Sequence, residues 1–297
     1  MRWSLGPCFD VWKNGFAEPA LVERRRVELM VKKIVQNGDN AKDRRPSKRA
    51  GWTSLFARRE KEPAAIPGGR RVYAIGDIHG RLDLLQKLWA LIERDRANTD
   101  LRITVVFVGD YVDRGRDSKG VIDFLLKIKE QGDVVCLRGN HDQAVLDFIA
   151  DAKFYRTWKP FGAPETLVSY GVMPPRFDDE AEFEKAREEF LANCPASHIE
   201  FLEGLPYCYE LGGYFFVHAG ARPGIPLKDQ EPEDMLWIRE DFLFSRADFE
   251  KVVVYGHTPV EQAGRRGHRL SIDTGAYATG HLSAAVLEGH DCRFLAT

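Results

Sequence analysis

Short apolar runs alternate with helical apolar spacing along the middle of the chain. Residues 70–77, 103–110 and 133–140 each contain an apolar run of strand length, whereas residues 81–95 and 118–132 repeat apolar side chains at helical intervals. This order of strand, helix, strand, helix and strand predicts βαβ units and a sheet that contains parallel pairs.

The second half of the chain changes character twice. Residues 143–206 are mainly helical in pattern and include the charged stretch 178–190. A hairpin is predicted at 207–220, with Gly212 and Gly213 at its turn. Three further apolar runs then predict a strand-rich end to the chain, at 251–258, 268–275 and 282–289.

Five of the predicted strands end in a residue type that binds metal ions. Four end in glycine followed by a ligand and the fifth ends in histidine, which singles out Asp77, Asp110, Asn140, His257 and His218. Carboxyl ends of strands are where sites assemble in α/β folds, and glycine lets the backbone approach closely. One such strand end is ordinarily a turn, but five in one chain predict a site.

The types of donor atom narrow the choice of metal ion. With His79, two residues after Asp77, the set holds carboxylate, amide and imidazole groups without thiolate. Such donors suit Mn, Fe or Zn. Six ligands are too many for one ion that keeps positions open for substrate, so the pattern favours two ions that share a carboxylate.

Composition fits one large globular domain with an extra segment. The chain has 297 residues, of which 44% are hydrophobic. No apolar run approaches the roughly 18 residues of a membrane span. Charged and polar residues interrupt the first 20 positions, so we expect no secretory leader. The five cysteines are scattered without a C-x-x-C pair, which indicates reduced thiols in a cytoplasmic protein.

Charge is distributed unevenly. Residues 1–70 carry 16 Lys and Arg against 8 Asp and Glu. We interpret residues 1–69 as a basic, largely irregular N-terminal extension with one helix predicted at Pro19–Val35. A solvated tail is the plainer interpretation, and contact with nucleic acid, an anionic membrane or an acidic partner is the alternative. Translation could also start at Met30.

Five short motifs together resemble one family. They are GDIHGR at 76–81, GDYVDRG at 109–115, GNHD at 139–142, HAG at 218–220 and GHTP at 256–259. In this order they resemble the motifs of the calcineurin-like metallophosphoesterases. Within that family they are most similar to the phosphoprotein phosphatase group, especially its bacterial and phage serine/threonine phosphatases. MLWIRE at 235–240 and SIDTGA at 271–276 also resemble the phage-type enzymes.

The resemblance implies an α/β fold for a catalytic domain at 70–297. We expect a two-layer mixed β-sandwich flanked by helices, with the site at the strand ends along one edge. Asp77 and His79 would hold a first divalent ion, Asp110 would bridge, and a second ion would be held by Asn140, His218 and His257. Two such ions would activate one water, and we expect them to be Mn, with Fe or Zn as the alternatives.

The same resemblance assigns roles to four further residues. Arg114 and Arg239 would bind phosphoryl oxygens, although Arg239 could also be a surface arginine at a helix start. His141 would be the general acid, and Asp113 would orient its ring and keep it protonated. Asp273 is either a hydrogen-bond partner of a metal-binding histidine or, as we favour, a strand-end turn. His198 is expected to be structural.

The leading interpretation is a metal-dependent phosphomonoesterase that acts on phosphoserine or phosphothreonine in proteins. Symmetrical dinucleoside tetraphosphate hydrolysis by the same metal core is the nearest alternative, and a binding module based on the basic extension is a third. A nuclease is disfavoured by the DRG sequence after Asp110. Asp113 favours phosphomonoesters, because a serine or threonine alkoxide leaves poorly without a protonated histidine.

Overall fold

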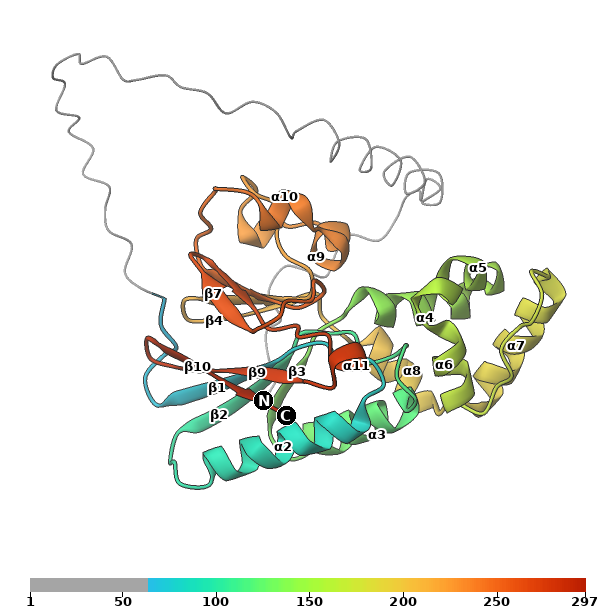
Figure 1. Ribbon diagram of the computed structural model, residues 1–297, viewed down its shortest axis with the longest axis horizontal. Coiled ribbons are helices and arrows are strands. Elements are labelled where there is room, and N and C mark those ends of the chain that lie inside the picture. The colour runs from blue at the N-terminus through green and yellow to red at the C-terminus, as the bar shows by residue number, and fades with distance from the viewer. Residues whose placement is uncertain (1–63) are drawn as a thin grey trace, which may run out of the picture. The chain divides into compact units, whose positions relative to one another are not determined.

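The structure is a computed structural model that describes residues 64–297 (Figure 1). Most of the predicted basic extension, with its helix at Pro19–Val35, lies outside the described residues. Ala64–Ile66, just before the first strand, contact the fold. The Ile66 amide donates to Gly289 O at 2.8 Å, and Ala65 O accepts the Gly213 amide at 2.9 Å.

The first sheet has five strands in the order β10, β9, β1, β2, β3. β1, β2 and β3 pair in parallel, whereas β9 and β10 add antiparallel pairs on the other side of β1. Their bounds are β1 Arg70–Ile75, β2 Arg102–Phe107, β3 Asp133–Cys136, β9 Ser283–Glu288 and β10 Asp291–Ala296. The connecting helices, α2 (Leu82–Arg96) and α3 (Ser118–Lys129), confirm the predicted βαβ units.

The second sheet is also mixed, in the order β4, β5, β6, β8, β7. The predicted hairpin is present as antiparallel β4 and β5, and β5, β6 and β8 run parallel. The strands are β4 Cys208–Leu211, β5 Tyr214–Val217, β6 Val252–Tyr255, β7 Gly264–Arg266 and β8 Arg269–Ser271. Three short helices follow in this half, α9 (Pro232–Trp237), α10 (Glu240–Leu243) and α11 (Ala276–Thr279).

Alternate side chains of the strands enter different cores. In β1, Tyr73 and Ile75 join a core shared with α2 and α3, whereas Val72 and Ala74 face the second sheet. In β6, Val254 packs between the sheets and Val253 packs on the side of α9 and α10. Strands buried on both faces explain the nearly continuous apolar runs. The predicted two-layer mixed β-sandwich flanked by helices is confirmed (Figure 1).

A helical segment at 140–203 extends beyond the sheets on the β3 side (Figure 1). It contains α4 (Asn140–Ala150), α5 (Tyr155–Trp158), α6 (Ala163–Ser169), α7 (Glu180–Asn193) and α8 (Ala196–Glu203). Its large buried side chains, including Trp158, Phe183 and Phe190, belong to the same core as α2 and α3. The prediction of a mainly helical stretch between β3 and β4 is confirmed.

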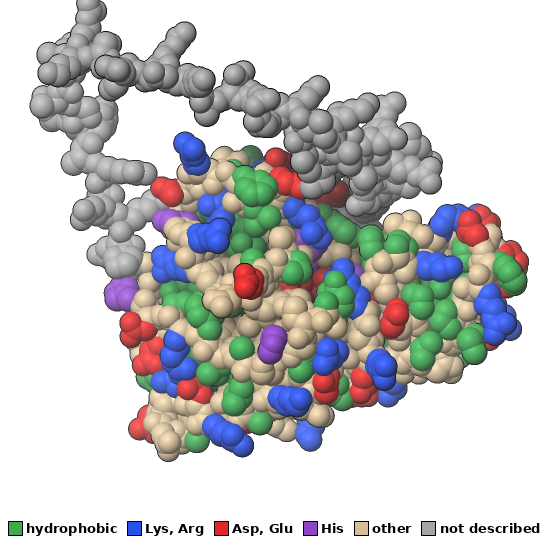
Figure 2. Space-filling model, in the orientation of Figure 1, with side chains coloured by type: hydrophobic (Ala, Val, Ile, Leu, Met, Phe, Trp, Pro, Cys, Tyr) green, Lys and Arg blue, Asp and Glu red, His purple; other side chains and the backbone are tan. Residues whose placement is uncertain are grey.

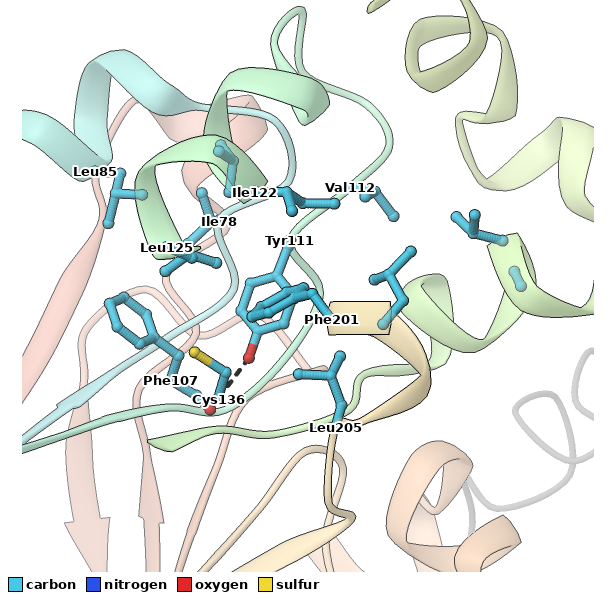
Figure 3. Packing of buried hydrophobic residues seen from close by; sticks show 14 of the residues in the cluster. Ile78, Leu85, Phe107, Tyr111, Val112, Ile122, Leu125, Cys136, Phe201 and Leu205 are labelled. Atoms are coloured by element: carbon cyan, nitrogen blue, oxygen red, sulfur yellow. Dashed lines mark hydrogen bonds between the residues drawn. The ribbon is translucent and has the colours of Figure 1, made fainter. Parts of the chain in front are cut away.

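Tyr111 ties the loop after β2 to this core. Figure 3 shows its ring among Phe107, Cys136 and Phe201. Its hydroxyl donates to Leu137 O at 2.7 Å, and its ring centroid lies 5.7 Å from that of Phe201. The loop that carries Asp110 and Asp113 is thereby anchored on its apolar side.

None of the helices at 64–297 combines the length and apolarity that crossing a bilayer requires.

Candidate active site

The predicted ligands meet at one edge of the two sheets. Loops after β1 and β2 supply Asp77, His79 and Asp110, and the first residue of α4, which follows β3, is Asn140. Loops after β5 and β6 supply His218 and His257. All six are buried, and the most accessible, His257, is 6% exposed. The structure therefore brings together donors that are up to 180 positions apart in the chain, as the His257 amide shows by donating to Asp77 Oδ2 at 2.9 Å.

The backbone is strained at these loops. Within residues 64–297, the non-glycine residues with positive φ are all predicted site residues. They are His79 (46°), Asp110 (56°), Asp113 (72°), Arg114 (64°) and His257 (63°). Side chains with a Cβ avoid this region, and such strain concentrates at functional sites. The pattern supports a site at these positions independently of the motifs.

Two of the strand-end glycines are required by close approach to a carboxylate. A Cβ on Gly139 would lie 2.1 Å from Asp110 Oδ1, and a Cβ on Gly256 would lie 2.0 Å from Asp77 Oδ1. Real Cβ atoms do not approach other atoms this closely. The glycine that precedes one predicted ligand therefore makes room for the carboxylate of another.

His79 and His218 present an unprotonated nitrogen to Asp110. Their Nδ1 atoms lie 2.9 Å from Val112 O and 3.0 Å from Val108 O. A carbonyl only accepts, so Nδ1 carries the proton and Nε2 faces the site, 3.5 Å from an Asp110 oxygen in each case. Burial lowers the pKa of His79 to about 3 and also lowers the pKa of His218. Neutral imidazole held by a carbonyl is the usual metal-binding form.

A second group of donors converges around His218 Nε2. Asn140 Oδ1 lies 2.9 Å from it and His257 Nδ1 lies 3.1 Å from it. Burial lowers the pKa of His257 well below its ordinary value, so this ring is neutral too. His257 Nε2 and Asp77 Oδ1 are buried and have no hydrogen-bond partner. Buried polar atoms are rarely left unpaired, so both atoms fit a site that takes up a cation.

The carboxyl groups are crowded. Burial, followed by the charges of Asp273 and Asp110, raises the pKa of Asp77. Burial and the charge of Asp110 raise the pKa of Asp142 to about 8. Burial acts to raise the pKa of Asp110, but its surroundings among the site imidazoles, His218 first, lower it overall, so this carboxylate stays ionised. Bound divalent cations would relieve this repulsion among like charges.

Two triads have ligand atoms that lie within 4.8 Å of one another. One is His79, Asp110 and His141, and the other is Asp110, His218 and His257. Asp110 belongs to both, which is the position expected of a bridging ligand. His141 enters the first triad beside Asp110, with Nε2 at 3.9 Å from Asp110 Oδ2. The donor set as a whole fits two divalent ions.

His141 and Asp113 form a buried pair next to this cluster. His141 Nδ1 lies 2.6 Å from Asp113 Oδ2. The carboxylate accepts a hydrogen bond, so Nδ1 carries a proton. The other ring nitrogen, Nε2, faces the site, where Arg114 Nη2 lies 3.2 Å away. Burial acts to lower the pKa of His141, but the charge of Asp110 and the hydrogen bond to Asp113 outweigh it, so the pKa is raised.

The two predicted arginines differ in how they are held. The Arg114 guanidinium lies 4.5 Å from the centroid of the Tyr277 ring. Arg239 is exposed and stands at the N-cap position of α10 without a side-chain capping hydrogen bond, as the surface-arginine alternative expected. Its positive charge nevertheless acts to lower the pKa of His218 and His257, after burial as the main cause.

Three aromatic rings line the site histidines. Tyr277 lies 5.5 Å from His79, Phe161 lies 5.6 Å from His141 and Trp237 lies 6.3 Å from His257, between ring centroids. Tyr277 is 40% exposed and Trp237 is 37% exposed. Aromatic rings thus surround the site histidines, and two of them, Phe161 and Tyr277, lie outside the motifs quoted from the sequence.

Two further carboxylates lie near the ligands, one of which, Asp142, the sequence analysis did not single out. Asp142 accepts the amides of Asp110, Tyr111 and Gly139 at 2.8–2.9 Å, and its position at N3 of α4 is a capping signal that could have indicated this. Asp273 does form the expected turn, with the Gly275 amide donating at 2.8 Å. It is also 2% exposed and its charge acts on Asp77. His198 is structural, hydrogen-bonded to Tyr170 and Asp123.

Comparison with known proteins agrees with this geometry. A family model described as calcineurin-like phosphoesterase matches residues 70–294. Serine/threonine-protein phosphatase 1 of Salmonella typhimurium is 28% identical over 227 residues, which cover 74% of this chain and 93% of that protein. The asymmetrical bis(5'-nucleosyl)-tetraphosphatase PrpE of Anoxybacillus flavithermus is 28% identical over 230 residues, which cover 71% and 87%. The crystal structure of a candidate diadenosine tetraphosphatase matches with a TM-score of 0.53 at 20% identity, covering 76% of this chain and 93% of that one.

Proposed function

Because the chain belongs to the calcineurin-like phosphoesterase family, we propose that this phosphate-ester hydrolase removes phosphate from phosphoserine and phosphothreonine in proteins. The observation that carries the proposal is the buried pair of His141 and Asp113, 2.6 Å apart. A serine or threonine alkoxide needs a proton as it leaves, and a histidine held protonated by a carboxylate supplies one.

In this proposal the strand-end residues hold two divalent ions, with Mn favoured over Fe or Zn. Asp77 and His79 would hold one ion, Asn140, His218 and His257 would hold the other, and Asp110 would serve both. When bound, such ions supply an activated water and neutralise charge on the phosphoryl group. The protein holds the imidazoles neutral and aimed inward through the carbonyls of Val108 and Val112.

The side chains around the ligands do the remaining work. Arg114 and Arg239 bind phosphoryl oxygens, for which a planar guanidinium is well suited. Arg114 Nη2 lies 3.2 Å from His141 Nε2, so an anion bound by Arg114 would lie beside the proposed acid. His141 gives its Nε2 proton to that oxygen, while Asp113 keeps Nδ1–H fixed and stabilises the imidazolium form.

Hydrolysis of dinucleoside tetraphosphates is the second candidate. It is favoured by the exposed rings of Tyr277 and Trp237, since an aromatic ring can stack on a nucleobase. A symmetrical bis(5'-nucleosyl)-tetraphosphatase of Coxiella burnetii is 30% identical over 174 residues, although these cover only 48% of that protein. A nucleoside diphosphate leaves readily, so this reaction makes less use of His141 and Asp113.

Relative kcat/KM on a phosphothreonine peptide and on diadenosine tetraphosphate tests the choice. We expect the peptide to be the better substrate, and Asp113→Asn to harm the peptide reaction more. Faster cleavage of the dinucleotide, with Asp113→Asn harmless to both reactions, would overturn the choice and leave the metal site intact.

We propose a reducing, cytoplasmic setting, because the five cysteines are scattered along the chain without a C-x-x-C pair. On the face drawn in Figure 2, Lys and Arg side chains are interspersed with Asp and Glu. Recruitment of a polyanion or an acidic partner is therefore assigned to the basic extension, residues 1–69, rather than to this face. Salt-dependent binding that disappears on removal of residues 1–60 would support this.

A further inference from the structure

We propose that Trp158 and Thr166, in the helical segment, are positioning residues that hold Asp113 in the orientation His141 needs as general acid. The inference rests on the proposed function, in which His141 protonates the leaving group. Neither residue lies in a motif that marks the metal site.

The two residues complete the hydrogen bonding of the Asp113 carboxylate. Oδ2 accepts His141 Nδ1–H at 2.6 Å and Trp158 Nε1–H at 2.8 Å. Oδ1 accepts the Thr166 hydroxyl at 2.6 Å. Asp113, Trp158 and Thr166 are each 0% exposed, so water does not reach these bonds in place of the side chains.

Thr166 also forms a hydrogen bond with the backbone of Asp113. The Asp113 amide donates to Thr166 Oγ1 at 2.9 Å and to Ser118 Oγ at 3.1 Å. Asp113 has a φ of 72°, a conformation that a residue with a Cβ holds only when its surroundings enforce it. Thr166 therefore fixes both ends of Asp113, the strained peptide and one carboxylate oxygen.

A buried carboxylate with fewer donors would be both costly and free to turn. With three donors bound to its two oxygens, the carboxylate plane cannot rotate freely. The orientation of that plane sets the direction of Oδ2 towards His141. Loss of the Trp158 donor leaves His141 as the partner of Oδ2, and loss of the Thr166 donor frees Oδ1. Either change loosens the imidazole ring, and proton transfer is sensitive to such misplacement.

The fold explains why these residues are in reach. The Trp158 ring packs against Phe148 of α4, with centroids 5.2 Å apart, and α4 is the helix whose first turn carries His141. The same helical segment thus supplies the acid and two of the groups that hold the acid's partner. The metal ligands receive no hydrogen bond from Trp158 or Thr166 among the described contacts.

The test compares a phosphothreonine peptide with 4-nitrophenyl phosphate, whose leaving group needs little protonation. Trp158→Phe removes the indole donor together with part of the ring. Thr166→Val keeps the branched shape but replaces the hydroxyl, which both donates to Asp113 Oδ1 and accepts from the Asp113 amide. We expect each to lower kcat on the peptide by about 10–100-fold, the usual effect of removing an outer hydrogen-bond partner. KM, the bound Mn content and kcat on 4-nitrophenyl phosphate should change by less than about threefold.

Matched controls lie on the same helices. Tyr155 is buried in α5, but its hydroxyl has no hydrogen-bond partner, so Tyr155→Phe should keep both activities. Thr166→Ser retains the hydroxyl and should recover most of the peptide activity that Thr166→Val loses. The two donor variants are independent, so the proposal stays testable on one if thermal melting shows that the other does not fold.

The outcomes separate this inference from the proposed function. Wild-type peptide rates in a folded variant, or equal losses on both substrates, overturn the positioning role. If His141→Asn shows the substrate-dependent loss and the donor variants do not, only this inference fails. If His141→Asn loses both activities equally, the general-acid role fails and the inference fails with it.

Discussion

The predicted metal ligands and the Asp113–His141 pair are neighbours in space but are held by different means. The ligands sit at strand ends, where close contacts at glycines such as Gly139 and Gly256 fix the backbone. The acid pair is held by side-chain donors from the helical segment, Trp158 and Thr166. The two halves of the site should therefore respond differently to substitution, one through metal content and the other through leaving-group dependence.

The largest effect is expected where both halves meet. Asp110 lies 3.5 Å from His79 and from His218, and accepts the His141 amide at 3.0 Å. Asp110→Asn should lose most of the bound metal and more activity than the roughly 10²–10⁴-fold expected of a general acid. Metal analysis and turnover of 4-nitrophenyl phosphate check this. A purified Asp110→Asn protein with two bound ions and full turnover would contradict the bridging assignment.

A change confined to the acid pair should leave the metals in place. His141→Asn should retain its ions and lose about 10²–10⁴ in kcat on a phosphothreonine peptide. The loss should shrink on aryl phosphates, because their oxygen leaves without a proton. Metal analysis and kcat on both substrates are the measurements. Loss of the ions in this variant would place His141 among the ligands, as its position in the first triad allows.

A change confined to the backbone near the ligands should weaken metal binding and should not depend on the leaving group. The Cβ of Gly139→Ala would collide with Asp110 Oδ1. We expect about 1–3 kcal/mol of destabilisation from overpacking, together with weaker Mn binding and similar fractional losses on aryl and alkyl phosphates. Gly132→Ala is the control, because a Cβ there meets nothing within 4 Å. A larger loss on the alkyl ester in Gly139→Ala would show that the two halves are not separable.

The smallest effect concerns the start of the described chain. Removal of residues 1–60 should leave hydrolysis of 4-nitrophenyl phosphate unchanged, because every proposed ligand comes later. Removal of residues 1–68 also deletes Ile66, which is 2% exposed. This longer deletion should lower stability by about 1.5–3 kcal/mol, the contribution of burying such a side chain. Thermal melting compares the two proteins, and equal melting temperatures would show that Ala64–Ile66 contribute little.

The contrast also explains what could be predicted from sequence. Apolar runs that end in Gly-Asp or Gly-Asn are local signals, and they predicted the strands, the βαβ units and the strand-end positions of the candidate ligands. Trp158 and Thr166 carry no local signal, since they lie 45 and 53 residues from Asp113 and meet it only through helix packing. Asp273 was interpreted as a turn because hydrogen bonding within the turn is visible in sequence, whereas its burial beside Asp77 is not.

The contact between Arg114 and Tyr277 has a thermodynamic consequence. A free arginine side chain gives up about 2 kcal/mol of rotamer entropy when it is immobilised on a ligand. Stacked on the ring at 4.5 Å, the Arg114 guanidinium has already lost part of that freedom before an anion arrives. Binding of a phosphoryl group should accordingly carry a smaller entropic penalty than it would at an unsupported arginine, and Tyr277→Ala should weaken inorganic phosphate binding mainly through a less favourable entropy of binding.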